Sequence, residues 1–71
     1  MTFHEWLSSA TQYWTEEPEQ RFGQALINSL IIHNKSVFDN LPRRLDVWEV
    51  KYPYADTELV LDFLHFVQDN W

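Results

Sequence analysis

Only one glycine occurs in this chain of 71 residues, at position 23, and its neighbours all favour a helix. Glycine in a helix interior is less favourable than alanine by about 1 kcal/mol, so another interaction must offset that cost. Because glycine has no Cβ atom, another group can approach its backbone closely. We therefore predict that an aromatic ring packs on Gly23, and the candidates are Trp6, Trp14 and Trp71.

The core must be dense and rich in rings. A domain of this length buries roughly 60% of the surface of its unfolded chain. The sequence has no cysteine for disulfide bonds or thiolate metal sites, but it has four Trp, three Tyr and five Phe. Large aromatic side chains are therefore the material that stabilises the fold.

Two helices are predicted in the first half of the chain. Thr2 and Glu5 have the spacing of a capping box, and apolar residues then recur at helical intervals over about residues 3 to 14. Thr15 and Pro18 have the features of a helix start, which predicts a second helix over about residues 18 to 33. Glu16 and Glu17, between Thr15 and Pro18, would then lie near the N-terminal end of this second helix.

The second half predicts a short turn, a loop and a last helix. Ser36 is the expected cap of a short helical turn that ends before Pro42. Residues 45–52 alternate like a strand, but a lone strand has no pairing partner, so an ordered loop is preferred. Asp56 is the expected cap of a helix over about residues 57 to 70.

The last helix has an unusually wide apolar arc, opposed only by the polar strip Glu58, Asp62, His65 and Asp69. Such a helix is either central in the fold or in contact with another chain as well, and the central position is preferred. The prediction is a compact all-α bundle of three main helices plus one short helix and an ordered loop, forming one domain over residues 1–71. Helix 2 and the last helix should form its centre, with these residues buried: Phe22, Leu26, Leu30, Leu59, Phe63, Phe66 and Val67.

Charge narrows the range of partners. Eleven acidic and five basic residues give a net charge of −6, which opposes binding to nucleic-acid phosphates and to anionic membranes. No leader or membrane-spanning segment is recognisable, so we expect a cytoplasmic chain whose partner is a protein, basic in character.

Residues for catalysis or metal binding are few. His4, His33 and His65 fall on different predicted elements without His-x-x-x-His spacing. His4 with Glu5, and His65 with Asp62 and Asp69, are the combinations considered as metal ligands, and ordinary surface histidines are the preferred interpretation. Ser8 and Ser9 lack the context of a nucleophile, and one glycine makes no phosphate loop. We expect no enzyme activity, cofactor or metal.

Exposed aromatic and acidic side chains are the better candidates for a binding site. Trp48, Tyr52 and Tyr54 lie in the segment least committed to helix packing, and Trp and Tyr often dominate interface energy. The alternative, weighed equally, is that these rings cover one end of the bundle. The acidic cluster Glu16, Glu17 and Glu19 could act as a second contact surface.

Several motifs carry a resemblance: Arg21-Phe22-Gly23-Gln24-Ala25 with Asn28 and Leu30, Tyr52-Pro53-Tyr54 with Asp56, Phe63-Leu64-His65-Phe66-Val67, and the final Asn70-Trp71. Over residues 14–71 the chain resembles a group of short uncharacterised bacterial, prophage and mobile-element proteins. It departs from them at Tyr52, where they have Asp, and over residues 36–50. The resemblance implies a small acidic protein that acts by binding host or defence proteins.

Three functions are compatible with these features. The first is a protein-binding module that inhibits or modulates a host protein by direct contact. The second is a self-associating protein that forms a homodimer through its last helix, since a small domain gains stability by burying an apolar arc. The third is a DNA mimic that presents carboxylates to a basic groove, which requires the acids to line one face.

Overall fold

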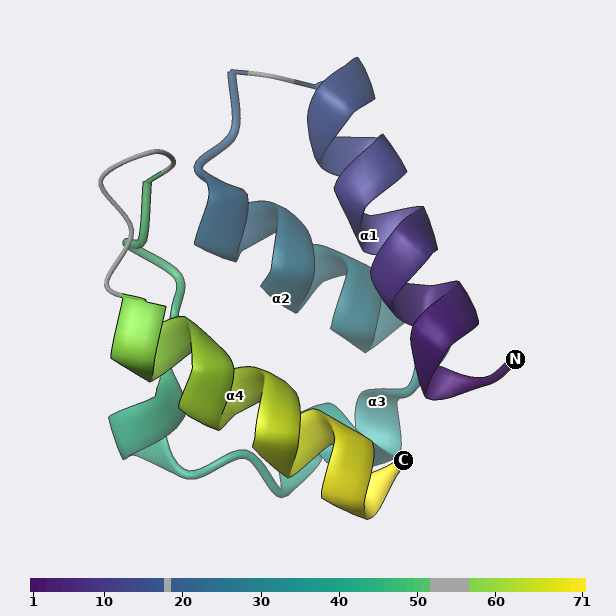
Figure 1. Cartoon of the computed structure of the whole chain (residues 1–71), viewed down its shortest axis with the longest axis vertical. Coiled ribbons are helices and arrows are strands. Elements are labelled where there is room, and N and C mark those ends of the chain that lie inside the picture. The colour runs from purple at the N-terminus through teal and green to yellow at the C-terminus, as the bar shows by residue number, and fades with distance from the viewer. Residues whose placement is uncertain (18, 52–56) are drawn as a thin grey trace.

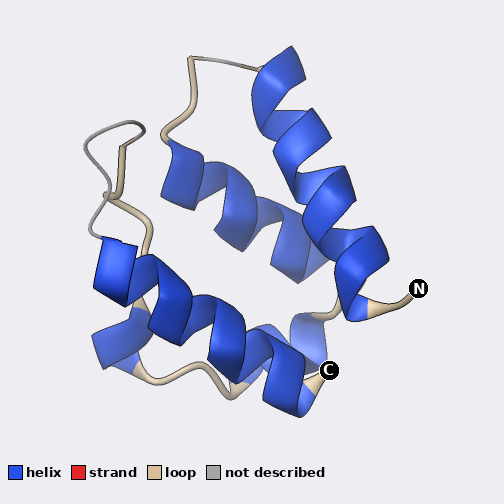
Figure 2. Ribbon diagram, in the orientation of Figure 1, coloured by secondary structure: helices blue, strands red, loops and turns tan. Residues whose placement is uncertain are grey.

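The computed structural model describes residues 1–17, 19–51 and 57–71, and the described part of the chain is built from helices joined by loops (Figure 1, Figure 2). Its elements are α1 (Phe3–Glu16), α2 (Phe22–His33), α3 (Lys35–Asp39), a short 3-10 helix η1 (Arg43–Leu45) and α4 (Thr57–Asn70). No strand occurs among these residues. The all-α prediction is confirmed, and so is the preference for a loop over a strand in residues 46–51, while Leu45 ends η1.

The capping box at the start of α1 is present as predicted. The Thr2 hydroxyl accepts a hydrogen bond from the Glu5 amide at 3.1 Å, and the Glu5 carboxylate accepts one from the Thr2 amide at 2.9 Å. These hydrogen bonds from Thr2 lower the pKa of Glu5 below its usual value of 4.5. They satisfy two of the free amide groups that every helix start exposes.

The junction between α1 and α2 differs from its prediction. The first helix continues to Glu16, and the hydroxyl of Thr15 bonds to the carbonyl of Thr11 within it, so Thr15 caps nothing. The second helix begins at Phe22, four residues later than expected, and has no acidic residue in its first turn. The acidic cluster therefore belongs to the end of α1 and the connection after it.

As predicted, another part of the chain approaches Gly23 closely, but it is loop backbone and not an aromatic ring. A Cβ atom at this position would overlap the carbonyl of Val47 and lie 3.2 Å from Val50 Cβ. The amide of Gly23 also donates a hydrogen bond to the Val50 carbonyl at 3.0 Å. Loop backbone, and no tryptophan ring, occupies the space that glycine leaves at the start of α2.

The second half of the chain follows the predicted order of elements. Asn34, and not Ser36, caps α3, because its side chain accepts a hydrogen bond from the Val37 amide at 3.3 Å. The bounds of α4 match those expected. Its predicted cap, Asp56, lies outside the described residues.

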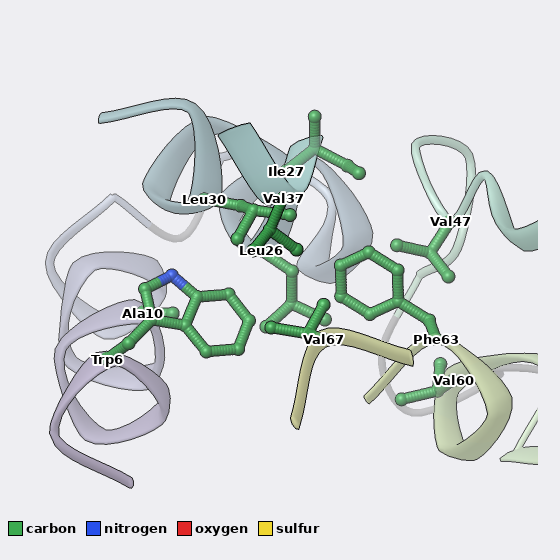
Figure 3. Packing of buried hydrophobic residues seen from close by; sticks show 10 residues of the cluster. All are labelled: Trp6, Ala10, Leu26, Ile27, Leu30, Val37, Val47, Val60, Phe63 and Val67. Atoms are coloured by element: carbon green, nitrogen blue, oxygen red, sulfur yellow. The ribbon is translucent and has the colours of Figure 1, made fainter. Parts of the chain in front are cut away.

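The core gathers side chains from all four α-helices of the described residues and from the loop (Figure 3). Leu26, Leu30, Phe63 and Val67 are buried as predicted, whereas Phe22, Leu59 and Phe66 are only half-buried. Sequence reasoning missed the buried residues Trp6, Ala10, Val37, Val47 and Val60.

The most buried helix is α2, and α4 meets it in the core as predicted, through Val60, Phe63 and Val67. Six of the twelve residues of α2 are buried, and its closest backbone packing is against α1. The backbone of α4 lies beside η1, and Leu59, Leu64 and Phe66 pack against the core from its flanks. On the outer face of α4, Leu61 stays 48% exposed. A wide apolar arc on α4 is thus only partly used within this chain.

Trp14 and Trp71, which were also predicted to be structural, pack at the edges of the core. The ring of Trp71 lies 5.7 Å from that of Trp6 and 6.5 Å from that of Phe3, between centroids, and its Nε1 donates to the Met1 carbonyl at 2.8 Å. Trp14 packs edge-on against Phe22 at 5.4 Å. These contacts join α1 to both of its neighbours.

Candidate partner-binding pocket

An apolar pocket of about 280 Å³ opens on the surface beside α2. Its walls come from four successive parts of the chain: α2, α3, the turn into η1 and the following loop. The lining residues are Ile27, Ile31, Phe38, Leu41, Pro42, Arg43, Asp46 and Trp48. This volume is near the lower limit for ligand pockets and suits one or two side chains of a partner protein.

The floor and one wall are set by helices. Ile27 and Ile31 are four residues apart on α2, so they lie one above the other on the same face. Phe38 is presented by α3, whose start is fixed by the Asn34 side chain. Since Ile27 is buried and Ile31 and Phe38 are half-buried, the pocket continues outward from the core.

Trp48 forms the opposite wall and is held by an ordered loop. The Asp46 Oδ1 atom accepts a hydrogen bond from the Trp48 amide at 2.9 Å, and the Val50 amide donates to the Val47 carbonyl at 2.9 Å, closing a tight turn. This turn rests on Gly23, as described above. The unusual glycine therefore positions the tryptophan that the sequence singled out.

A second contact ties the same loop to the start of α2. Arg21 Nε lies 3.4 Å from Glu49 Oε2, an ion pair whose geometry does not form a hydrogen bond. The Glu49 side chain is 78% exposed. Such a pair contributes little free energy, so the backbone contact at Gly23 is the stronger anchor of the loop.

The rim of the pocket is charged. Arg43 and Asp46 line it, both are exposed, and neither forms an ion pair with a described residue. Arg44 follows on η1 and is also exposed and without an ion pair in the described ranges. One oxygen of Asp46 already accepts the Trp48 amide, whereas the guanidinium donors of both arginines remain available.

The structure separates the predicted binding residues. Trp48 lines the pocket, whereas Tyr52 and Tyr54 lie outside the described residues. Glu16, Glu17 and Glu19 are exposed, line no part of the pocket and lie at and just after the C-terminal end of α1, at the opposite end of the molecule from α3 and η1 (Figure 1). Among the described candidates, Trp48 and the three glutamates do not form one surface.

Most pocket residues were not identified from the sequence. Ile27 and Ile31 form an apolar strip on α2 beside the strip that packs in the core, and this second strip was the available signal. Phe38, Leu41 and Arg43 carried no such signal. These three residues line one pocket with Trp48 only because of how α3 and η1 are placed relative to α2.

The residues considered for catalysis and metal binding lie elsewhere. His4, Glu5, Ser8 and Ser9 border a wide hollow on the outer face of α1. The Glu5 carboxylate there already accepts the Thr2 amide. Within the described ranges, no group of three His, Asp or Glu side chains is placed to hold a metal ion.

Comparison with models of protein families, with curated protein sequences and with solved structures finds no match for this chain. No helix in the described part combines the length and apolarity needed to cross a membrane. What the chain binds has to be inferred from the pocket itself.

Proposed function

We propose that this chain is a small protein-binding module that contacts its target through the pocket beside Trp48. The observation that supports it is the pocket's construction: apolar walls from α2, α3 and the loop meet at a half-buried tryptophan, with the exposed Arg43 guanidinium at the rim. Interface energy is concentrated in such aromatic-lined pockets with charged surroundings.

The target inserts an apolar side chain into the pocket. A volume of about 280 Å³ accepts one anchor of Leu, Phe or Met size, and the rim groups can then pair with polar groups around it. The resemblance to short prophage and mobile-element proteins favours a host or defence protein as the target, which the module would inhibit or modulate by direct contact.

The DNA-mimic alternative has less support. Glu16, Glu17 and Glu19 lie at the end of α1 and in the connection after it, whereas Glu58 and Asp62 lie on α4, so these acids come from separate elements. A mimic should lose affinity steeply as salt rises, because its binding is mostly between charges. Binding anchored by an apolar side chain should change much less.

Capture of the target from native cells, with the tagged chain as bait, tests the proposal. Trp48→Ala and Arg43→Ala should each reduce recovery of the partner about tenfold or more. The matched control is Ile32→Ala, which removes the most exposed large hydrophobic side chain of the described residues (66% exposed), and Ile32 lines no part of the pocket.

Circular dichroism must show that each variant keeps the helical content of the parent. Recovery of the same partners by folded Trp48→Ala and Arg43→Ala variants would refute the pocket as the contact site. Arg43→Ala is the decisive variant if Trp48→Ala unfolds, because Arg43 is exposed and packs in no core cluster.

A further inference from the structure

We infer that the pocket also receives a second copy of this chain, with Leu61 of α4 as the anchor and Glu58 and Asp62 facing Arg43 and Arg44. The inference rests on the proposed function only in using the same pocket, and it names one occupant. Both surfaces are present on the same molecule, and they match in apolar character and in charge.

The anchor lies on the outer face of α4. Leu61 is 48% exposed and is one of three large apolar side chains exposed in the described ranges. Glu58 and Asp62 are three residues before it and one after it, both are exposed, and neither has an ion pair with a described residue. Residues 58, 61 and 62 share one face of a helix, so this patch is an apolar side chain beside two carboxylates.

The pocket offers the complementary arrangement. Its apolar walls can enclose a leucine side chain, and Arg43 lines its rim. Arg44 is the next residue of η1, and both arginines are exposed and form no ion pair with a described residue. Arginine and carboxylate groups form strong bidentate hydrogen bonds. Insertion of a helix face into an apolar groove is a common mode of recognition. Asp46 would repel the incoming acids, so they must approach from the η1 side.

A reciprocal pair explains how both contacts form at once. In one molecule α4 lies beside η1, so the anchor and the rim are on neighbouring elements (Figure 1). A two-fold axis between such neighbours places each Leu61 near the pocket of the other copy, which is the closed arrangement of most dimers. The net charge of −6 opposes association, so the dimer should be weak and depend on these local charges.

The size of the contact also indicates a weak dimer. A standard stable interface buries about 800 Å² on each partner. That is about a sixth of the 4785 Å² surface of this small molecule. One anchor and its charged surroundings cover less than this, so we expect a dissociation constant in the micromolar to millimolar range.

Sedimentation equilibrium of the full chain from about 5 µM to about 1 mM tests the inference. We expect a monomer–dimer equilibrium that Leu61→Ala weakens about tenfold or more. The double variants Arg43→Glu/Arg44→Glu and Glu58→Lys/Asp62→Lys should weaken it similarly, because each places like charges together. Combining all four substitutions in one chain should restore dimerisation to within about threefold of the parent.

Two controls match the variants. Ile32→Ala removes an exposed apolar side chain away from the pocket and from α4, and Lys51→Glu reverses an exposed charge that lines neither surface. Both should leave association unchanged within about twofold, apart from the general effect of net charge. Circular dichroism verifies that each variant is folded. If a charge variant unfolds, sedimentation of the Leu61→Ala variant tests the inference.

A strict monomer at millimolar concentration would overturn the inference. So would a dimer that Leu61→Ala leaves intact, or one that Ile32→Ala weakens equally. None of these results affects the proposed function, which fails only if folded pocket variants keep their cellular partners. Conversely, a dimer with the expected mutational pattern stands even if no other target is captured.

Discussion

Gly23 shows how one residue can decide where a loop rests. The space of its missing side chain holds the Val47 carbonyl, and its amide bonds to the Val50 carbonyl. This backbone contact fixes the turn that presents Trp48, so a position at the start of α2 determines the shape of a pocket farther along that helix. Any side chain at residue 23 must displace loop backbone, which cannot move as a flexible side chain does.

We therefore expect Gly23→Ala to lower the free energy of unfolding by about 1–3 kcal/mol, the usual range for overpacking. Helix propensity alone predicts the opposite sign, since alanine is better than glycine by about 1 kcal/mol. Urea denaturation measures the change, and Gly23→Leu should be worse than Gly23→Ala. Unchanged or increased stability of the alanine variant would show that the loop does not rest on this residue.

Glu5 gives the chain a contribution to stability that depends on pH. Hydrogen bonds from Thr2 lower its pKa in the folded state below the ordinary value of 4.5. Because the folded pKa is the lower one, the ionised carboxylate stabilises the fold above about pH 4.5, and this contribution is lost as pH falls through the folded pKa.

The comparison with Glu5→Gln isolates this effect from the other carboxylates. Glutamine can keep a capping-box hydrogen bond but carries no charge. The parent should be more stable than Glu5→Gln near pH 6, and the difference should shrink as pH falls below 4.5. Urea denaturation at several pH values measures it. A difference that is constant with pH would contradict the assigned cause.

Among the elements, α3 is the shortest α-helix and depends most on its cap. Five residues make little more than one helical turn, which is marginal without outside support. The Asn34 side chain bonds to the Val37 amide, Val37 is buried, and Phe38 lines the pocket. The cap therefore supports both a core residue and a pocket residue.

Asn34→Ala should lower the free energy of unfolding by about 1 kcal/mol, the typical cost of losing a side-chain cap. Asn34→Asp should retain most of the stability, because aspartate is an equally good cap. Asn40→Ala is the matched control, since Asn40 is the C-cap of α3 and its side chain donates, among the described residues, to the exposed Ser36 carbonyl. Equal losses in urea denaturation for Asn34→Ala and Asn40→Ala would rule out a special role for the cap.

The elements also show what the sequence could and could not predict. Helical spacing and the capping box located α1 and α4 well, because those signals are local. The start of α2 was misplaced, because Thr15 and Pro18 resemble a helix start that the chain does not use. The pocket escaped prediction apart from Trp48, because its walls come from separate elements whose relative positions no local pattern encodes.

At the scale of the whole molecule, the two ends of the chain are joined. Trp71 donates a hydrogen bond from Nε1 to the Met1 carbonyl at 2.8 Å, and its ring packs on Trp6 and Phe3 of α1. Since α4 otherwise lies beside η1 and reaches the core through a few side chains, this contact is a main link between the last helix and the first. It also keeps α4 in place with Leu61 outward.

Trp71→Phe keeps a ring but loses the hydrogen bond, so the free energy of unfolding should fall by about 0.5–1.5 kcal/mol. Trp71→Ala also loses the ring contacts with Trp6 and Phe3, and the decrease should reach about 2 kcal/mol. Amide hydrogen exchange distinguishes a link from a local contact. Protection should decrease at the start of α1 as well as in the last turn of α4, because each end holds the other. Faster exchange confined to α4 would show that the Trp71 contact does not stabilise α1.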